Sequence, residues 1–220
     1  MPRVIDWGRR DYEDALAAMR RAVAERRAGA IEDTLVLVEH PPVITVGVEG
    51  DDGGASESGL PVVRVERGGQ GTYHGPGQLV GYPIVDLERR GRDVRRFVHD
   101  VEAVVIDALA SFGVRAQHVS GRHGVWVEGR RKIASIGIAV DHWVTFHGFA
   151  LNVDLDLAPF ERFRPCGLDG SLMTSLAREL GRPVALAEAK PPIETAWGER
   201  FRSFAPLATA EGRATASSSA

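Results

Sequence analysis

Hydrophobic residues recur at helical spacing in two long stretches of the chain. In residues 12–28 the apolar positions are Tyr12, Leu16, Met19 and Val23. In residues 93–112 they are Val94, Phe97, Val98, Val101, Val105, Leu109 and Phe112. Positions three and four apart share one side of a helix, and Gly29 ends the first pattern. The spacing predicts two amphipathic helices that pack on a core.

Short runs rich in β-branched residues predict strands around these helices. They occupy residues 34–40, 43–48, 61–69, 79–87 and 144–155. Residues 124–140 predict a hairpin of two strands, with its turn at Glu128-Gly129. Strands joined mostly by hairpins, with helices but without regular βαβ alternation, indicate an α+β or mixed α/β domain.

The C-terminal part of the chain predicts two more helices, near residues 171–180 and 191–204. The second is expected to begin at Pro191-Pro192, because proline is favourable in a first helical turn. Residues 207–220 are small and polar, which predicts a disordered tail. We therefore expect one domain over residues 1–206.

Composition excludes several classes of protein. The 220 residues carry a net charge of −3, which gives no general reason to bind nucleic acid or an anionic membrane. There is no run of 18 apolar residues and no apolar secretory run at the start. One cysteine excludes an internal disulfide and is typical of a reducing compartment. The cytoplasm is the expected location.

Residues 66–78 (ERGGQGTYHGPGQ) form the densest concentration of glycine in the chain. Glycine lets the backbone approach a ligand closely, and the same stretch holds several hydrogen-bonding side chains. The spacing matches neither a phosphate-binding GxxxxGK[ST] loop nor a GxGxxG fingerprint, because His74 stands where the last glycine would fall. A ligand-binding loop is favoured over an irregular hairpin loop.

Cys166 and Lys132 are candidates for catalysis because each is rare here. Cys166 is the only thiol, and it lies in a polar turn beside Arg162 and Arg164, before a predicted helix. Cations and a helix N-terminus both lower the pKa of a thiol, although a lone cysteine is more often a small buried hydrophobe. The proton carrier that such a nucleophile needs could be His74, His147 or Lys132.

Lys132 is one of two lysines among 27 Lys and Arg residues. Lysine can lose its proton in a protein and arginine cannot, so a site that moves a proton could require lysine here. An accidental lysine in a basic turn is the alternative.

The histidines do not predict a metal site. His118 and His123 are five residues apart, as are His142 and His147, and this spacing does not place a pair on one face of a strand or helix. The chain has no CxxC or HExxH motif. We expect no metal ion, and nothing in the sequence predicts another cofactor.

The motif RGGQGTYHGPGQLVGYP (67–83) resembles the signature of the lipoyl(octanoyl) transferases. The stretches RRKIASIGI, FHGFALNVDLDL and PCG follow in the order and at the approximate spacing of that family. The similarity covers about residues 30–180. One departure is Gly71, where the family has a bulkier residue.

The resemblance implies a fold like the catalytic domain of biotin and lipoate protein ligases, a mixed sheet flanked by helices. It implies that Cys166 carries the acyl group as a thioester and that Lys132 lowers the thiol pKa and handles protons. The residues that it assigns to the acyl substrate are Arg67, Gly68, Gly69, Gln70, Gly71, Thr72, Tyr73, His74, Ser135, Ile136, Gly137, Gly148, Phe149 and Ala150.

The implied reaction moves an octanoyl group from octanoyl-acyl carrier protein to a lysine of a lipoyl domain. The acceptors would be the lipoyl domains of 2-oxoacid dehydrogenases and the glycine cleavage H protein. Three alternatives stay open: an ATP-dependent lipoate or biotin ligase, a non-catalytic binding protein for acyl carrier or lipoyl domains, and a cysteine hydrolase.

Overall fold

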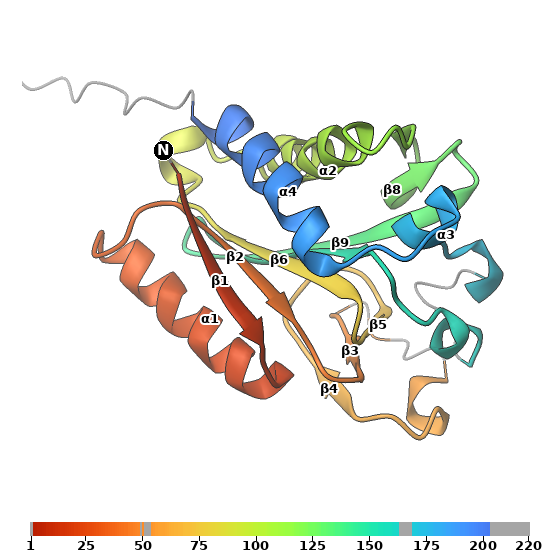
Figure 1. The fold of residues 1–220 in the computed structure, drawn as a ribbon. Helices are drawn as coiled ribbons and strands as arrows, with labels where there is room; N and C mark the ends of the chain where they lie inside the picture. Colours follow the sequence, from red (N-terminus) through yellow and green to blue (C-terminus); the bar gives the residue numbers. More distant parts are fainter. Residues whose placement is uncertain (1, 49, 51–53, 163–168, 203–220) are drawn as a thin grey trace, which may run out of the picture.

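A seven-stranded sheet forms the centre of the structure, a computed structural model that describes residues 2–48, 50, 54–162 and 169–202 (Figure 1). In spatial order its strands are β1 (Arg3–Arg9), β2 (Thr34–Glu39), β6 (Gln78–Ile84), β10 (Val144–Asn152), β9 (Arg131–Asp141), β8 (Arg122–Val127) and β7 (Ala116–Val119). β1 and β2 are parallel and are joined by helix α1 (Tyr12–Arg27), whereas the other neighbouring pairs are antiparallel.

A smaller sheet lies beside the large one and is made of β4 (Val62–Arg64), β3 (Val43–Val46) and β5 (Gly71–His74). β3 pairs with β4 in parallel and with β5 in antiparallel orientation. Short 3₁₀ helices lie at Ala55–Glu57, Glu88–Arg90, Ala158–Glu161 and Gly170–Leu172. The middle of the glycine-rich stretch, Gly71–His74, is therefore a strand, where the sequence predicts a loop.

Helices cover both faces of the large sheet. Figure 1 shows α1 on one face, with α2 (Val94–Ala110) and α4 (Leu186–Phe201) side by side on the other. A fourth, short helix is α3 (Leu176–Leu180). Successive strand residues point to opposite faces, so Val36 packs in the core under α1 and Leu37 in the core under α2 and α4. This arrangement confirms the predicted mixed sheet flanked by helices.

The strongest sequence patterns agree with the structure. Both amphipathic helices form, at Tyr12–Arg27 and Val94–Ala110, and the β8–β9 hairpin turns where predicted. Glu128 and Gly129 have φ angles of 51° and 69°. Two successive positive φ values are those of a type I′ turn, whose twist suits a hairpin.

Other boundaries differ from the predictions. α4 begins at Leu186, so Pro191 and Pro192 lie inside the helix and not at its start. Proline in a helix interior costs about 3 kcal/mol. Burial of Ile193 and Trp197 against the core offsets this cost. β1 and β7 were not predicted, and the predicted tail at 207–220 lies outside the described residues.

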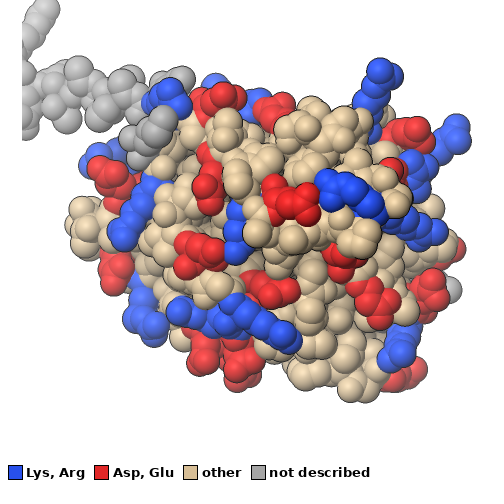
Figure 2. Space-filling model, in the orientation of Figure 1, with Lys and Arg blue, Asp and Glu red and all other residues tan. Residues whose placement is uncertain are grey.

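Charges of both signs are mixed on the face of the molecule shown in Figure 2. Figure 2 shows Lys and Arg interspersed with Asp and Glu over the face that it displays. Within the described ranges, no helix has both the length and the apolar character needed to cross a bilayer.

Candidate active site

A cavity of about 340 Å³ is lined by both layers of helices, by the segment 67–70 and by strands β5, β6, β8, β9 and β10. The fold brings Lys132 and most of the sequence-predicted substrate residues to this one space. Those that line it are Arg67, Gly68, Gly69, Gln70, Thr72, His74, Ser135, Ile136, Gly137, Gly148, Phe149 and Ala150. Three separate sequence stretches thus meet at a single site.

Gly71 and Tyr73 do not line the cavity, because they lie in a strand. In β5 successive residues alternate, so Thr72 and His74 face the cavity, and Gly71 and Tyr73 lie on the other face. Tyr73 instead packs edge-on against Phe160, with ring centroids 5.6 Å apart. The sequence prediction treated residues 66–78 as a loop, so it missed this alternation.

Arg67 ties the glycine-rich segment to β3, and the backbone of Gly68 ties it to β9. Its guanidinium donates hydrogen bonds to the carbonyl and hydroxyl oxygens of Thr45, at 2.7 and 2.9 Å, and to the carbonyl oxygen of Gly68 at 3.0 Å. The Gly68 N–H donates to the carbonyl oxygen of Ile138 at 3.1 Å. A Cβ at Gly137 would lie 2.8 Å from Cδ of Arg67, so a side chain there would push this clamp away.

Lys132 lies at one end of the cavity and is only 3% exposed. Its ammonium nitrogen is 5.9 Å from the centroid of the buried Trp126 ring, within the range of a cation–π interaction. Its carbonyl oxygen accepts a hydrogen bond from the Thr174 N–H at 2.9 Å, and Lys132 forms a parallel bridge with Met173. The chain that follows residues 163–168 therefore returns to the backbone of Lys132.

A chain of buried hydrogen bonds connects the glycine-rich segment to that return point. The Gln78 side chain bonds to Nδ1 of His74 at 2.8 Å and donates to Oδ1 of Asn152 at 2.9 Å. Asn152 in turn donates from Nδ2 to the carbonyl oxygen of Thr174 at 2.9 Å. These residues fix His74, the end of β10 and the backbone beside Lys132 relative to one another.

Sequence reasoning counted Gln78 among the polar side chains of the glycine-rich stretch without giving it a role in the site, and it did not single out Asn152. Both are only 1% exposed and both lie at strand ends. The available signal was a polar side chain in an otherwise apolar strand pattern, in stretches that already carried the family resemblance. A buried amide must be hydrogen-bonded, and here it serves to position the site.

A second part of the cavity lining gathers aromatic and imidazole groups. Burial lowers the pKa of His147 to about 4, with the nearby Arg67 charge acting in the same direction. Burial also lowers the pKa of His74 well below its usual value, and it raises the pKa of Tyr12 to about 12. Tyr82 has a raised pKa for the same reason. These four groups are neutral at pH 7.

His74 and His147 differ from Lys132 for separate reasons: His74 already has partners at both ring nitrogens, and His147 lies far from Lys132 along the sheet. Both ring nitrogens of His74 have partners, Gln78 at 2.8 Å and Thr45 at 3.2 Å. His147 pairs across the sheet with Ile138, six positions along β9 from Lys132. At about 3.3 Å per residue, this separates the two backbones by roughly 20 Å. Of the three candidate proton carriers, Lys132 alone lies next to the returning chain.

Cys166 and Arg164 lie outside the described residues. The chain on either side of them is placed: the backbone at Gly170 packs so closely on that at Phe160 that a Cβ there would lie 2.1 Å from the Phe160 carbonyl oxygen. Asp169 caps the 3₁₀ helix at Gly170–Leu172, accepting from the Ser171 N–H at 2.9 Å. The segment that carries the thiol is thus anchored at both ends.

The fold is that of the lipoate and biotin protein ligases. Lipoate-protein ligase A bound with ATP superposes with a TM-score of 0.71 at 15% identity, over 92% of this chain and 86% of that one. The biotin protein ligase of Aquifex aeolicus gives a TM-score of 0.56 at 11% identity, over 93% of this chain and 71% of that one.

The chain belongs to the family of the lipoyl protein ligase A/B catalytic domain, whose family model matches residues 11–198. It is 50% identical over 191 residues to the octanoyltransferase of Geobacter sulfurreducens, which covers 87% of this chain and 81% of the relative. It is 47% identical over 201 residues to the octanoyltransferase of Geotalea uraniireducens, which covers 91% of this chain and 92% of the relative.

Proposed function

We propose that this protein is an octanoyltransferase that moves an octanoyl group from octanoyl-acyl carrier protein to the acceptor lysine of a lipoyl domain. The relatives named octanoyltransferase support the reaction class. The observation that carries the proposed mechanism is the position of Lys132. It is buried at the end of the cavity and its backbone is bonded to Thr174, eight residues after the only cysteine.

In the first half-reaction the Cys166 thiolate attacks the carbonyl carbon of the octanoyl thioester. A new S–C bond forms on Cys166, the C–S bond to the carrier breaks, and the carrier thiolate leaves. Lys132 holds the proton that Cys166 released and gives it to the leaving thiolate. The nucleophile is more reactive as a thiolate than as a thiol, which is the reason for a neighbouring base.

In the second half-reaction the acceptor lysine must attack as a neutral amine. A C–N bond forms, the C–S bond to Cys166 breaks, and the amine loses one proton. Lys132 accepts this proton and passes it to the departing Cys166 thiolate. An arginine could not do this, because the guanidinium stays protonated.

The cavity supplies apolar surface for the acyl chain, in particular the side chains of Val80, Ile136, Ile138, Phe149 and Trp126. An eight-carbon chain, at about 0.8 kcal/mol per buried CH₂, contributes roughly 5 kcal/mol of binding. One methylene more or less changes binding by about 1–3 kcal/mol. The proposed specificity for octanoyl is therefore real but incomplete.

The incoming thioester is already activated, so the proposal requires neither ATP nor another cofactor. The proposed acceptors are the lipoyl domains of 2-oxoacid dehydrogenases and the glycine cleavage H protein. The proposed compartment is the cytoplasm, on the basis of the single cysteine.

The test is a transfer assay with octanoyl-acyl carrier protein and a purified lipoyl domain, without ATP, read by the intact mass of the lipoyl domain. The expected product carries one octanoyl group, and a lipoyl domain whose acceptor lysine is changed to arginine gains none. Modification that requires free octanoate and ATP would identify a ligase. Release of free octanoate without an acceptor would identify a hydrolase.

A further inference from the structure

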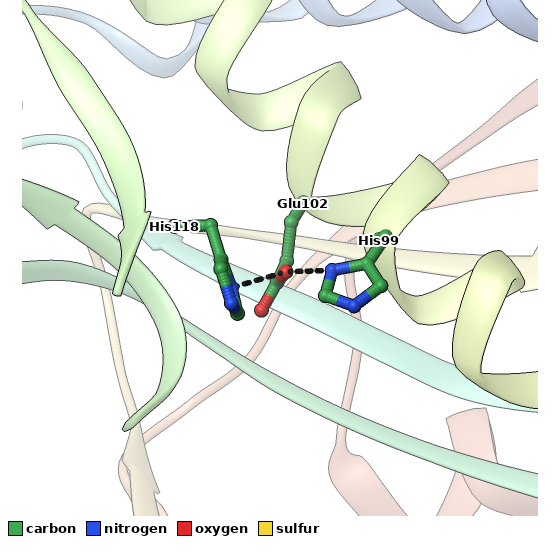
Figure 3. A group of neighbouring side chains, drawn as sticks. All are labelled: His99, Glu102 and His118. Carbon is green, nitrogen blue, oxygen red and sulfur yellow. Dashed lines mark hydrogen bonds and ion pairs between the residues drawn. The ribbon is translucent and has the colours of Figure 1, made fainter. Parts of the chain in front are cut away.

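A buried carboxylate with two imidazoles lies on the side of the sheet covered by α2, apart from the catalytic residues proposed above. Figure 3 shows His99 and Glu102 on α2 pointing toward His118 on β7. One carboxylate oxygen of Glu102, Oε2, is 3.2 Å from Nδ1 of His99 and 3.0 Å from Nδ1 of His118. One ligand atom from each of the three residues lies within 4.8 Å of the others.

From this geometry we propose that His99, Glu102 and His118 bind a divalent transition-metal ion of the zinc class. Zinc binds imidazole nitrogen at about 2.0–2.1 Å and carboxylate oxygen at about 2.0–2.2 Å, which places tetrahedral donor atoms roughly 3.3–3.5 Å apart. The separations from Oε2 are close to this value. Two histidines and a glutamate with an open fourth position form a ligand set that zinc sites use.

The burial of Glu102 supports a cation here. Its side chain is 3% exposed, whereas those of His99 and His118 are 59% and 43% exposed. A buried carboxylate requires a compensating charge, and imidazole carries charge only when it is protonated. A divalent ion supplies that charge at any pH at which the imidazoles are neutral. The exposed side of the cluster leaves room for water to complete the coordination.

The second oxygen of the carboxylate is held by the protein. Oε1 of Glu102 accepts a hydrogen bond from the Gly124 N–H at 3.3 Å. Metal-binding carboxylates are usually oriented by such an outer bond. Gly124 also packs on Lys132, since a Cβ there would lie 2.8 Å from Lys132 Cε. The ion would thus tie α2 to β7. Through Glu102 and Gly124 it would also tie α2 to β8, the strand that packs on Lys132.

Histidine pairs close in the sequence did not indicate this site. The sequence prediction considered His118 and His123 as a pair within one strand or helix. In the structure they lie on different strands, β7 and β8. The partners of His118 are instead on α2, with Glu102 sixteen residues earlier in the chain. Only the packing of α2 against β7 brings the three residues together.

The test is zinc binding by the full-length protein after removal of metal with a chelator. Zn²⁺ is titrated in competition with a chromophoric chelator, and Co²⁺ is added separately to record its visible absorption. We expect one equivalent of Zn²⁺, a four-coordinate Co²⁺ spectrum, and a higher Tm with Zn²⁺ than without. His99→Gln and His118→Gln should each weaken binding by more than the roughly 10–100-fold caused by losing an outer partner.

His142→Gln is the matched control, because His142 is an exposed histidine that bonds to Asp141, away from this cluster. It should bind Zn²⁺ as the wild type does. A second control blocks Cys166 by alkylation, so that the thiol contributes nothing to the measurement. His99 and His118 are both substantially exposed, so at least one variant should fold, which circular dichroism checks. Equal binding by wild type and a folded His99 or His118 variant, or no binding at micromolar Zn²⁺, would overturn the proposal.

Discussion

Two groups of cavity-lining residues are both buried, yet they differ in chemistry. In the first, Lys132 packs beside Trp126 and its backbone bonds to the segment that follows the only cysteine. In the second, Tyr12, His74, Tyr82 and His147 are neutral because burial shifts each pKa away from pH 7. Burial alone therefore does not identify a catalytic group.

The difference shows which polar residues can take part in proton transfer. A group that exchanges protons with Cys166 must reach it, and the chain that follows the cysteine-bearing segment bridges to Lys132 at Met173. The buried histidines are themselves neutral and help to shape the part of the cavity that they line, where Arg67 is the nearby charge. The predictions below test these groups separately.

Cys166→Ser should produce the largest effect. We expect nearly complete loss of octanoyl transfer with an unchanged circular dichroism spectrum, because an alcohol is a far poorer nucleophile than a thiolate at neutral pH. Transfer to a lipoyl domain measures the loss. Near wild-type transfer by this variant would exclude the covalent mechanism.

Lys132→Arg should reduce transfer by about 10²–10⁴-fold, the usual contribution of a general acid–base group. The positive charge is kept and proton exchange is lost. Rapid-quench measurement of acyl-enzyme formation, and transfer from preloaded enzyme, separate the two half-reactions. Transfer should suffer at least as much as loading, since the incoming amine must lose a proton.

Lys132→Met is the control for the greater bulk of arginine, because it has similar length and no charge. If Lys132→Arg keeps full rates in both halves, Lys132 is only a nearby charge. The proton carrier would then be sought at His74 or His147, which both line the cavity.

A buried histidine should affect the pH dependence of the free energy of unfolding and not the transfer chemistry. Burial lowers the pKa of His40, which bonds to Tyr82 at 2.7 Å, from 6.5 to about 4. Above pH 6.5 the imidazole is neutral in both states. As the pH falls toward 4 the unfolded chain takes up a proton that the folded protein does not, so the free energy of unfolding decreases.

At pH 5 this loss from His40 amounts to roughly 2 kcal/mol relative to pH 7.5. Urea unfolding at the two pH values measures it. In His40→Gln, the difference in the free energy of unfolding between pH 7.5 and pH 5 should be smaller by roughly 2 kcal/mol. This holds whatever the stability of the variant at pH 7.5. An unchanged difference between the two pH values would show that His40 is not held neutral.

Truncation after residue 206 should have the smallest effect. The removed residues are mostly alanine, serine and threonine and have little apolar surface to bury. Transfer rate and Tm should stay close to those of the full chain. A fall of many degrees in Tm would show that this segment packs on the domain.

The elements that the sequence predicts well are those whose own pattern is sufficient. The stripe on α2 and the Glu128-Gly129 turn need no distant partner, and both are where expected. The start of α4 was wrong because tertiary packing of Trp197 and Ile193 overrides the local preference of Pro191. β1 is half-exposed at the edge of the sheet, so its pattern is weak.

The site residues also divide into those that a local motif predicts and those that only tertiary packing brings together. The glycine-rich segment and the stretch from Ser135 to Gly137 were found because compact motifs carry them. Gln78 and Asn152 act through each other, 74 residues apart, and only the fold shows that pairing. The same holds for His99 and His118, which no local spacing connects.

The most direct test of the central claim is the intact mass of this protein after mixing with octanoyl-acyl carrier protein and no acceptor. The account predicts an increase of one octanoyl group, located on Cys166 by peptide mapping, and its disappearance when a lipoyl domain is added. An unmodified protein that still transfers octanoyl, or an adduct on another residue that is passed to the lipoyl domain, would contradict it.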